Sequence, residues 1–60
     1  MLYTFTVPGG RKVAIRRQYI KYMIADKTGH GTDVIFHDGT FLLLEEELDK
    51  VIAELGEQTN

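Results

Sequence analysis

An Asp-Gly dipeptide between two apolar runs is the feature of this sequence that most constrains its fold. Asp38 and Gly39 follow residues 32–37 and precede residues 40–44, and both flanking runs are rich in residues that favour strands. A two-residue turn of this kind needs positive φ at both central positions, and Asp-Gly meets that need well. The sequence therefore predicts an antiparallel hairpin here.

The two strands of this hairpin have different patterns. In residues 32–37, Val34 and Phe36 share one parity and should enter the core, while Ile35 faces the other way. Residues 41–44, Phe-Leu-Leu-Leu, do not alternate at all, so this strand should be covered on both faces. We expect a helix to cover one face and a second copy of the chain to cover the other.

The N-terminal half carries further strand signals. Residues 1–7 alternate with period two, with Tyr3 and Phe5 on the apolar parity, and a Pro-Gly-Gly segment favours a reversal after them. Residues 11–16 have the pattern of a second antiparallel strand, with Val13 and Ile15 inward. Residues 19–25 fit either a strand or a single helical turn. We favour a short turn at residues 17–19 and then a strand, because Tyr and Ile favour strands and a glycine-rich hairpin loop follows.

The C-terminal segment has the pattern of an amphipathic helix. Four apolar residues recur at the spacing i, i+3, i+4 and i+7: Leu48, Val51, Ile52 and Leu55. Glutamates 45–47 should form the first turn, where the helix dipole favours negative charge, and Gly56 stands where a C-terminal cap belongs. Residues 57–60 should fray.

These patterns predict an α+β fold: a twisted antiparallel sheet of four or five strands linked by hairpins and followed by one C-terminal helix, in a single domain over residues 1–56. A chain of this length hides only about 60% of the surface that its unfolded form exposes. There is no cysteine, so disulfides cannot supplement the small core. We therefore expect a homodimer. Its interface is predicted at four apolar strand residues: Leu2, Ile35, Leu42 and Leu44.

Charge is distributed unevenly along the chain. Residues 1–25 carry five basic and no acidic residues, whereas residues 26–60 carry nine acidic residues and two lysines. Basic residues interleaved with tyrosines are typical of surfaces that bind RNA or single-stranded DNA. The candidates for this alternative are Arg11, Lys12, Arg16, Arg17, Tyr19, Lys21 and Tyr22. The sequence pI of about 5.5, far from the value of a basic binding domain, weighs against it.

The sequence offers little for catalysis or metal binding. It contains no serine and no cysteine, which removes two common nucleophiles. His30 and His37 stand seven residues apart across a strand, so they should face opposite sides, and they match no zinc spacing. We therefore expect no catalytic site, no metal site and no cofactor.

Nothing in the sequence predicts a membrane protein. No apolar run approaches the roughly 18 residues of a membrane-spanning helix. The N-terminal residues lack the basic and apolar regions of a secretory signal. We expect a cytoplasmic protein.

Four segments resemble the flagellar FlbD-like family of small bacterial proteins: residues 10–15 (GRKVAI), 19–20 (YI), 32–39 (TDVIFHDG) and 47–52 (ELDKVI). The resemblance extends over nearly the whole chain and consists of a hydrophobic pattern with a turn glycine. It implies a small cytoplasmic accessory protein without an active site.

The chain is also similar in outline to the carbon-storage-regulator family of RNA-binding proteins. Both begin with Met-Leu and end in a strand followed by a Glu-Glu helix. That family forms an interleaved dimer and binds RNA through an arginine late in the first strand and another at the start of the helix. Thr6 and Glu45 stand at these positions here, so the resemblance implies a similar architecture without that mode of RNA binding.

The sequence thus predicts a small non-enzymatic interaction or regulatory protein, homodimeric, that binds a protein partner through a sheet face or edge. The alternative is an RNA- or DNA-binding regulator that uses the basic residues of segment 11–21.

Overall fold

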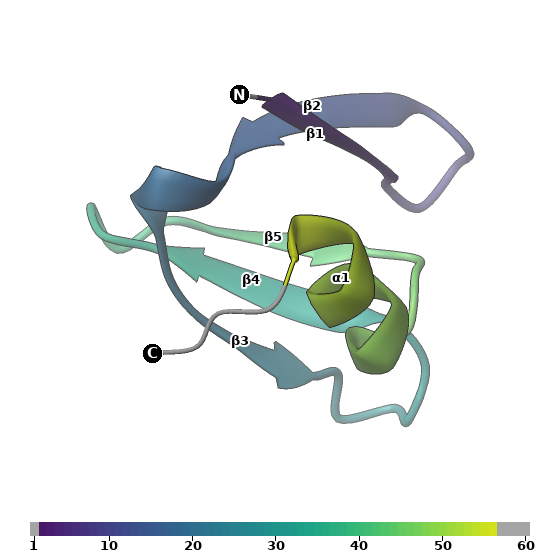
Figure 1. Ribbon diagram of the computed structural model, residues 1–60. Coiled ribbons are helices and arrows are strands. Elements are labelled where there is room, and N and C mark those ends of the chain that lie inside the picture. The colour runs from purple at the N-terminus through teal and green to yellow at the C-terminus, as the bar shows by residue number, and fades with distance from the viewer. Residues whose placement is uncertain (1, 57–60) are drawn as a thin grey trace.

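The computed structural model describes residues 2–56, which form an α+β fold of five strands and one α-helix (Figure 1). Within these residues the strands divide between two antiparallel sheets, a two-stranded hairpin and a three-stranded sheet. The predicted fold class and the C-terminal helix are confirmed. The predicted fraying of residues 57–60 lies outside the described residues.

Strands β1 (Leu2–Thr6) and β2 (Lys12–Arg16) form the N-terminal hairpin. Its inward side chains are buried or half-buried: Tyr3, Phe5, Val13 and Ile15. In the connecting turn the Gly10 amide donates to the Val7 carbonyl at 3.0 Å, and Gly10 has a φ of +85°, which glycine adopts without strain. Period-two alternation in the sequence therefore identified the inner face of this hairpin correctly.

The three-stranded sheet contains β3 (Ile20–Ala25), β4 (Thr32–Phe36) and β5 (Phe41–Leu44), with β4 in the centre. A short 3-10 turn, Arg17–Tyr19, connects the hairpin to β3. The preferred interpretation of this region, a turn followed by a strand, is confirmed.

The hairpin between β4 and β5 is present, but its turn differs from the predicted one. The Gly39 amide donates to the Phe36 carbonyl at 3.0 Å, and the Phe36 amide donates to the Thr40 carbonyl at 2.9 Å. Gly39 has a φ of +93°, and every residue with a positive φ within residues 2–56 is a glycine. The loop therefore has three residues and ends in a left-handed glycine. Asp38 instead accepts hydrogen bonds from the amide and hydroxyl of Thr40, at 3.0 and 2.7 Å.

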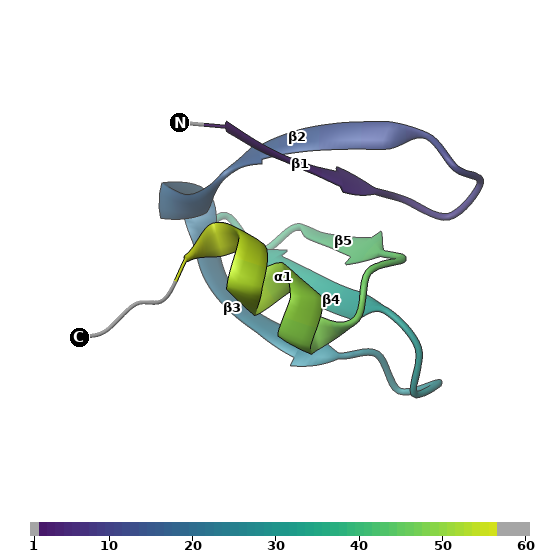
Figure 2. The ribbon, with the colours of Figure 1, turned by 45° about the vertical axis from the view of Figure 1, so that its right-hand side comes forward.

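Helix α1 (Leu48–Leu55) lies across one face of the three-stranded sheet (Figures 1 and 2). Val51 and Leu55 are buried, whereas Ile52 is 43% exposed, so the buried stripe is narrower than the sequence predicts. The helix ends at Leu55, and Gly56 is its C-cap residue, as predicted; its φ is +83°, which glycine adopts without strain.

The hairpin, the helix and the inner face of the three-stranded sheet enclose the core. Its buried apolar residues are Phe5, Ile15, Val34, Leu44, Val51 and Leu55. In both views of the ribbon the helix covers one face of the sheet, and no described element crosses the opposite face (Figures 1 and 2). The fold therefore leaves that second face available to solvent or to a partner.

Candidate functional site

A bulge in β3 determines which of its apolar side chains face solvent. The pairing with β4 shifts between Ile20 and Tyr22, so Lys21 is the extra residue. Beyond the bulge Met23 packs against the core, while Tyr22 and Ile24 face outward and are 53% and 52% exposed. A regular strand would have placed Tyr22 and Ile24 on the same face as the half-buried Ile20.

The outward residues of β4 and β5 extend this exposed surface across the sheet. Phe41 is 72% exposed, more than any other large apolar residue in the described part of the chain. Ile35 and Leu43 are half-buried. We call the six outward positions the open face: Tyr22, Ile24, Asp33, Ile35, Phe41 and Leu43.

The register arranges the open face in two rows that cross the strands. Tyr22 lies opposite Ile35, which lies opposite Phe41, and these residues form an uninterrupted apolar row. In the neighbouring row Asp33 stands between Ile24 and Leu43. The side chains of the open face are therefore apolar except for the Asp33 carboxyl group and the Tyr22 hydroxyl group.

Two of the residues predicted for a dimer interface, Ile35 and Leu2, lie in different sheets. Ile35 lies at the centre of the apolar row, as predicted. Leu2 is 54% exposed but lies on the outer side of the hairpin, in the other sheet. It therefore does not contribute to the open face.

The other two predicted interface residues face the core, which corrects the prediction. Leu44 is fully buried and Leu42 is half-buried against the core. The turn explains the error: a two-residue turn would pair Val34 with Leu43, but the three-residue loop pairs Val34 with Leu42. A shift of one residue exchanges the two faces of a strand. The outward residues of β5 are consequently Phe41 and Leu43.

Asp33 is held by a neighbouring carboxyl group at one end of the open face. Its hydrogen bond with Asp26 is the main cause that raises the pKa of Asp33. The pKa of Asp26 is lowered, first by the hydroxyl of Thr28, which donates to its carboxylate at 2.7 Å, and then by the bond with Asp33. The two carboxyl groups are therefore neighbours at the end of the open face nearest the β3–β4 loop.

The three glutamates before α1 do not form its first turn, contrary to the prediction. The helix begins at Leu48 with Glu47 as its N-cap residue, so Glu45 and Glu46 precede it. The Glu45 amide donates to the Thr6 carbonyl at 2.7 Å, and the Thr6 amide donates to both carboxylate oxygens of Glu46 at 3.0 Å. The Glu46 carbonyl also accepts from the Thr32 hydroxyl at 2.7 Å.

These contacts fix the hairpin to the three-stranded sheet, and they also lower the pKa of Glu46. Burial alone would raise the pKa of Glu46, but hydrogen bonds from Thr6 and from the Glu46 amide, together with the charge of Lys12, outweigh it and hold the pKa below the ordinary value of 4.5. Glu46 therefore anchors the hairpin to the segment that follows β5.

The histidines do not converge on a common site. His30 Nδ1 lies 3.8 Å from the Glu47 carboxylate, with both side chains largely exposed. His37 is exposed at the end of β4. Within residues 2–56, no three His, Asp or Glu side chains are grouped so that they could hold a metal ion.

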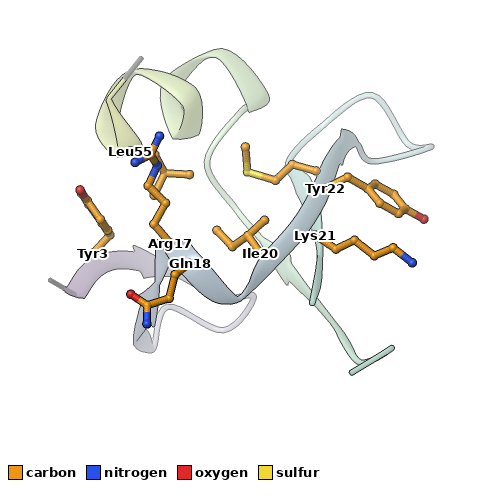
Figure 3. Close-up of a pocket in the computed structure, with 8 residues that line it drawn as sticks. Tyr3, Arg17, Gln18, Ile20, Lys21, Tyr22 and Leu55 are labelled. Carbon is orange, nitrogen blue, oxygen red and sulfur yellow. The ribbon is translucent and has the colours of Figure 1, made fainter. Parts of the chain in front are cut away.

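The seven residues predicted for nucleic-acid binding are divided among separate parts of the surface. Arg17, Lys21 and Tyr22 line a depression of about 560 Å³ whose other lining residues include Tyr3 and Leu55. Figure 3 shows Arg17 extending toward Leu55, while Lys21 and Tyr22 extend away from it. These side chains thus border one depression without forming one basic surface.

The remaining basic residues lie elsewhere. Arg11 and Lys12 line a second depression, of about 390 Å³, between the hairpin and β5. Arg16 and Tyr19 line neither depression. Lys12 is also engaged within the fold, since its ammonium donates to the Thr6 hydroxyl at 3.1 Å.

No family model, curated protein or solved structure matches the chain. The resemblances to the FlbD-like and carbon-storage-regulator families therefore stay predictions from the residues. In the part of the chain that the structure describes, no helix has the length and apolar character needed to cross a membrane.

Proposed function

We propose that this protein is a small non-enzymatic interaction module whose open face binds a protein partner, and that this partner is a second copy of the chain. The observation that carries the proposal is the uninterrupted apolar row of Tyr22, Ile35 and Phe41. Contiguous exposed apolar surface on a small protein marks an interaction site, because leaving it in water is unfavourable.

The size of the core favours a second copy as the partner. Only six apolar residues are buried among the described residues of this 60-residue chain. Packing two open faces against each other would create a second apolar layer, as in a β-sandwich, where sheets pack about 10 Å apart. This layer would add the burial that a chain of this length lacks.

The polar residues on either side of Ile35 are compatible with a two-fold dimer. Asp33 and His37 lie two residues before and two residues after Ile35. A two-fold axis that crosses the strands at Ile35 would stack the apolar row on its own copy. The same axis would bring each Asp33 near His37 of the partner subunit and keep the two Asp33 carboxyl groups apart.

Sedimentation equilibrium of the wild type and two variants tests this proposal. Phe41→Lys places a charge on the apolar row without touching the core, and we expect it to raise the dimer dissociation constant by roughly 30-fold or more, as for an interface hot spot. Leu2→Lys is the matched control, because Leu2 is also exposed but lies outside the open face. A wild type that stays monomeric at millimolar concentration, or a Phe41→Lys variant that dimerises normally, contradicts the proposal.

The nucleic-acid alternative has a separate test. Its residues do not share one surface, and the protein has a net charge of -2. Salt-sensitive binding of a single-stranded RNA that is lost on joint substitution of Arg16→Ala and Arg17→Ala would establish that alternative in place of the proposed function.

A further inference from the structure

The backbone of β5 has an unpaired edge on the side away from β4. The Phe36 amide donates to the Thr40 carbonyl, and pairs that are joined by hydrogen bonds alternate with unjoined pairs along an antiparallel ladder. Val34–Leu42 is therefore a joined pair, and the amides and carbonyls of Phe41 and Leu43 point toward the other edge. Within residues 2–56 these groups have no hydrogen-bond partner across that edge.

A groove runs along this edge. Leu42 and Leu43, whose side chains point to opposite faces of the sheet, both line the depression of about 390 Å³, so this space lies beside the edge of β5. Figures 1 and 2 both show the hairpin on the side of β5 that faces away from β4. We call this space the edge groove; the hairpin residues that line it are Val7, Pro8, Arg11, Lys12 and Val13.

The hairpin is held in place beside β5 at one end of the groove. The Glu45 amide, directly after β5, donates to the Thr6 carbonyl at 2.7 Å, and Glu46 accepts from the Thr6 amide. At this end the spacing between the hairpin and β5 is therefore set before any ligand arrives, which lowers the entropic cost of binding.

The opposite edge of the same sheet is protected in a way that β5 is not. Strand β3 carries a bulge at Lys21, and bulges and lysines are devices that discourage added strands. The sequence of β5, Phe-Leu-Leu-Leu, contains no charge, no proline and no bulge. The edge of β5 is therefore the one that can accept another strand.

We propose that the edge groove binds an extended peptide in which apolar residues alternate with acidic ones, and that the peptide adds a strand to β5. The backbone of Phe41 and Leu43 supplies the hydrogen bonds, as in other cases of strand addition. The apolar side chains of the peptide enter between Val13 and Leu42, and its carboxylates face the exposed Arg11. The site goes beyond the proposed dimer, because it uses the strand edge and not the open face.

Peptide titrations followed by amide NMR test this site on the full chain. The probe is a hexapeptide in which valine alternates with glutamate, and the expected result is a shift of the Phe41 and Leu43 amide signals. The same peptide with lysine in place of glutamate should have an affinity that is lower by a factor of about ten or more. Methylation of the peptide nitrogens that face β5 should have a similar effect, because it removes the backbone donors while the protein stays unchanged.

Three protein variants complete the experiment. Arg11→Glu should weaken binding of the glutamate peptide about tenfold, whereas Lys21→Glu, the same charge change at the other edge, should leave it unchanged. Leu43→Pro removes an amide at the free edge and should abolish binding. Circular dichroism confirms that each variant is folded.

Several results would overturn the proposal. They are the absence of binding at millimolar peptide, equal affinity for the glutamate and lysine peptides, and equal affinity for the methylated peptide. Shifts confined to Tyr22, Ile24 and Ile35 would also overturn it and would place the peptide on the open face. A monomeric wild type in sedimentation would contradict the dimer and leave this site intact, so the two proposals fail independently.

Discussion

The two faces of the three-stranded sheet carry similar apolar side chains but differ in what covers them. On the inner face Val34 and Leu44 are fully buried beneath the hairpin and the helix. On the open face Tyr22, Ile24 and Phe41 are more than half exposed. Hydrophobicity alone therefore does not distinguish the residues that fold this chain from those that we propose to assemble it.

The difference has an energetic meaning. Burying a leucine or valine side chain contributes about 1.5–3 kcal/mol, so the inner face contributes much of the free energy of folding. A side chain that stays exposed in the monomer contributes little until a partner covers it. We expect substitutions on the inner face to change stability and substitutions on the open face to change association.

Neighbouring leucines in β5 provide the sharpest test of this contrast and the largest expected effect. Leu44→Ala leaves a cavity in the core and should lower the free energy of unfolding by about 2–5 kcal/mol. Leu43→Ala removes the same atoms on the open face and should lower it by less than about 1 kcal/mol in the monomer. Urea denaturation followed by circular dichroism at low protein concentration measures both, and equal losses would contradict the assignment of faces.

A second prediction concerns the close approach between the start of β4 and the end of β5. A Cβ added to Gly31 would lie 2.5 Å from the Leu44 carbonyl oxygen, and the φ of Gly31 is +88°. Gly31→Ala should therefore destabilise the fold by about 2–3 kcal/mol, from backbone strain and from displacement of β5.

Gly29→Ala is the matched control for this substitution. Gly29 has the same φ of +88°, but an added Cβ there would meet no atom within 4 Å. Its loss should be about 1 kcal/mol, from backbone strain alone. If the two variants unfold at the same denaturant concentration, the close contact at Gly31 has no energetic importance.

A third and smaller effect concerns the contact that fixes the hairpin beside the sheet. Glu46→Gln keeps the shape of the side chain but removes its charge, and it should cost about 1 kcal/mol near pH 7. Because the folded pKa of Glu46 is lowered, its contribution is fully present above the ordinary value of 4.5 and is lost as the pH falls below it.

The pH dependence is measured as the difference in unfolding free energy between the wild type and Glu46→Gln. This difference should shrink between pH 6 and pH 3. Asp26 and Asp38, whose pKa values are also lowered, occur in both proteins and cancel in the comparison. A difference that stays constant with pH would show that the Glu46 charge does not support the hairpin.

Patterns that extend over a whole element were readable from the sequence. The alternation in β1 and β2 gave the inner face of the hairpin, and the helical stripe gave Val51 and Leu55 as buried residues. In each case many residues contribute to one periodic signal, so the prediction tolerates local irregularities.

Features that depend on a single residue were not readable. The loop after β4 has three residues instead of two, which shifts the register and turns Phe41 and Leu43 outward in place of Leu42 and Leu44. Because residues 41–44 are all apolar, no alternation within β5 could reveal this shift. The bulge at Lys21 also depends on a single residue, and it exchanges the two faces of β3.

The open face as a dimer interface can be tested most directly by isotope-filtered NMR on a mixture of labelled and unlabelled protein. A dimer packed through the open face should give intermolecular NOEs from the Ile35 methyl groups of one copy to Ile35 and to the Tyr22 ring of the other. Intermolecular NOEs at Leu2 on the hairpin, or none at a concentration where the protein is dimeric, would contradict it.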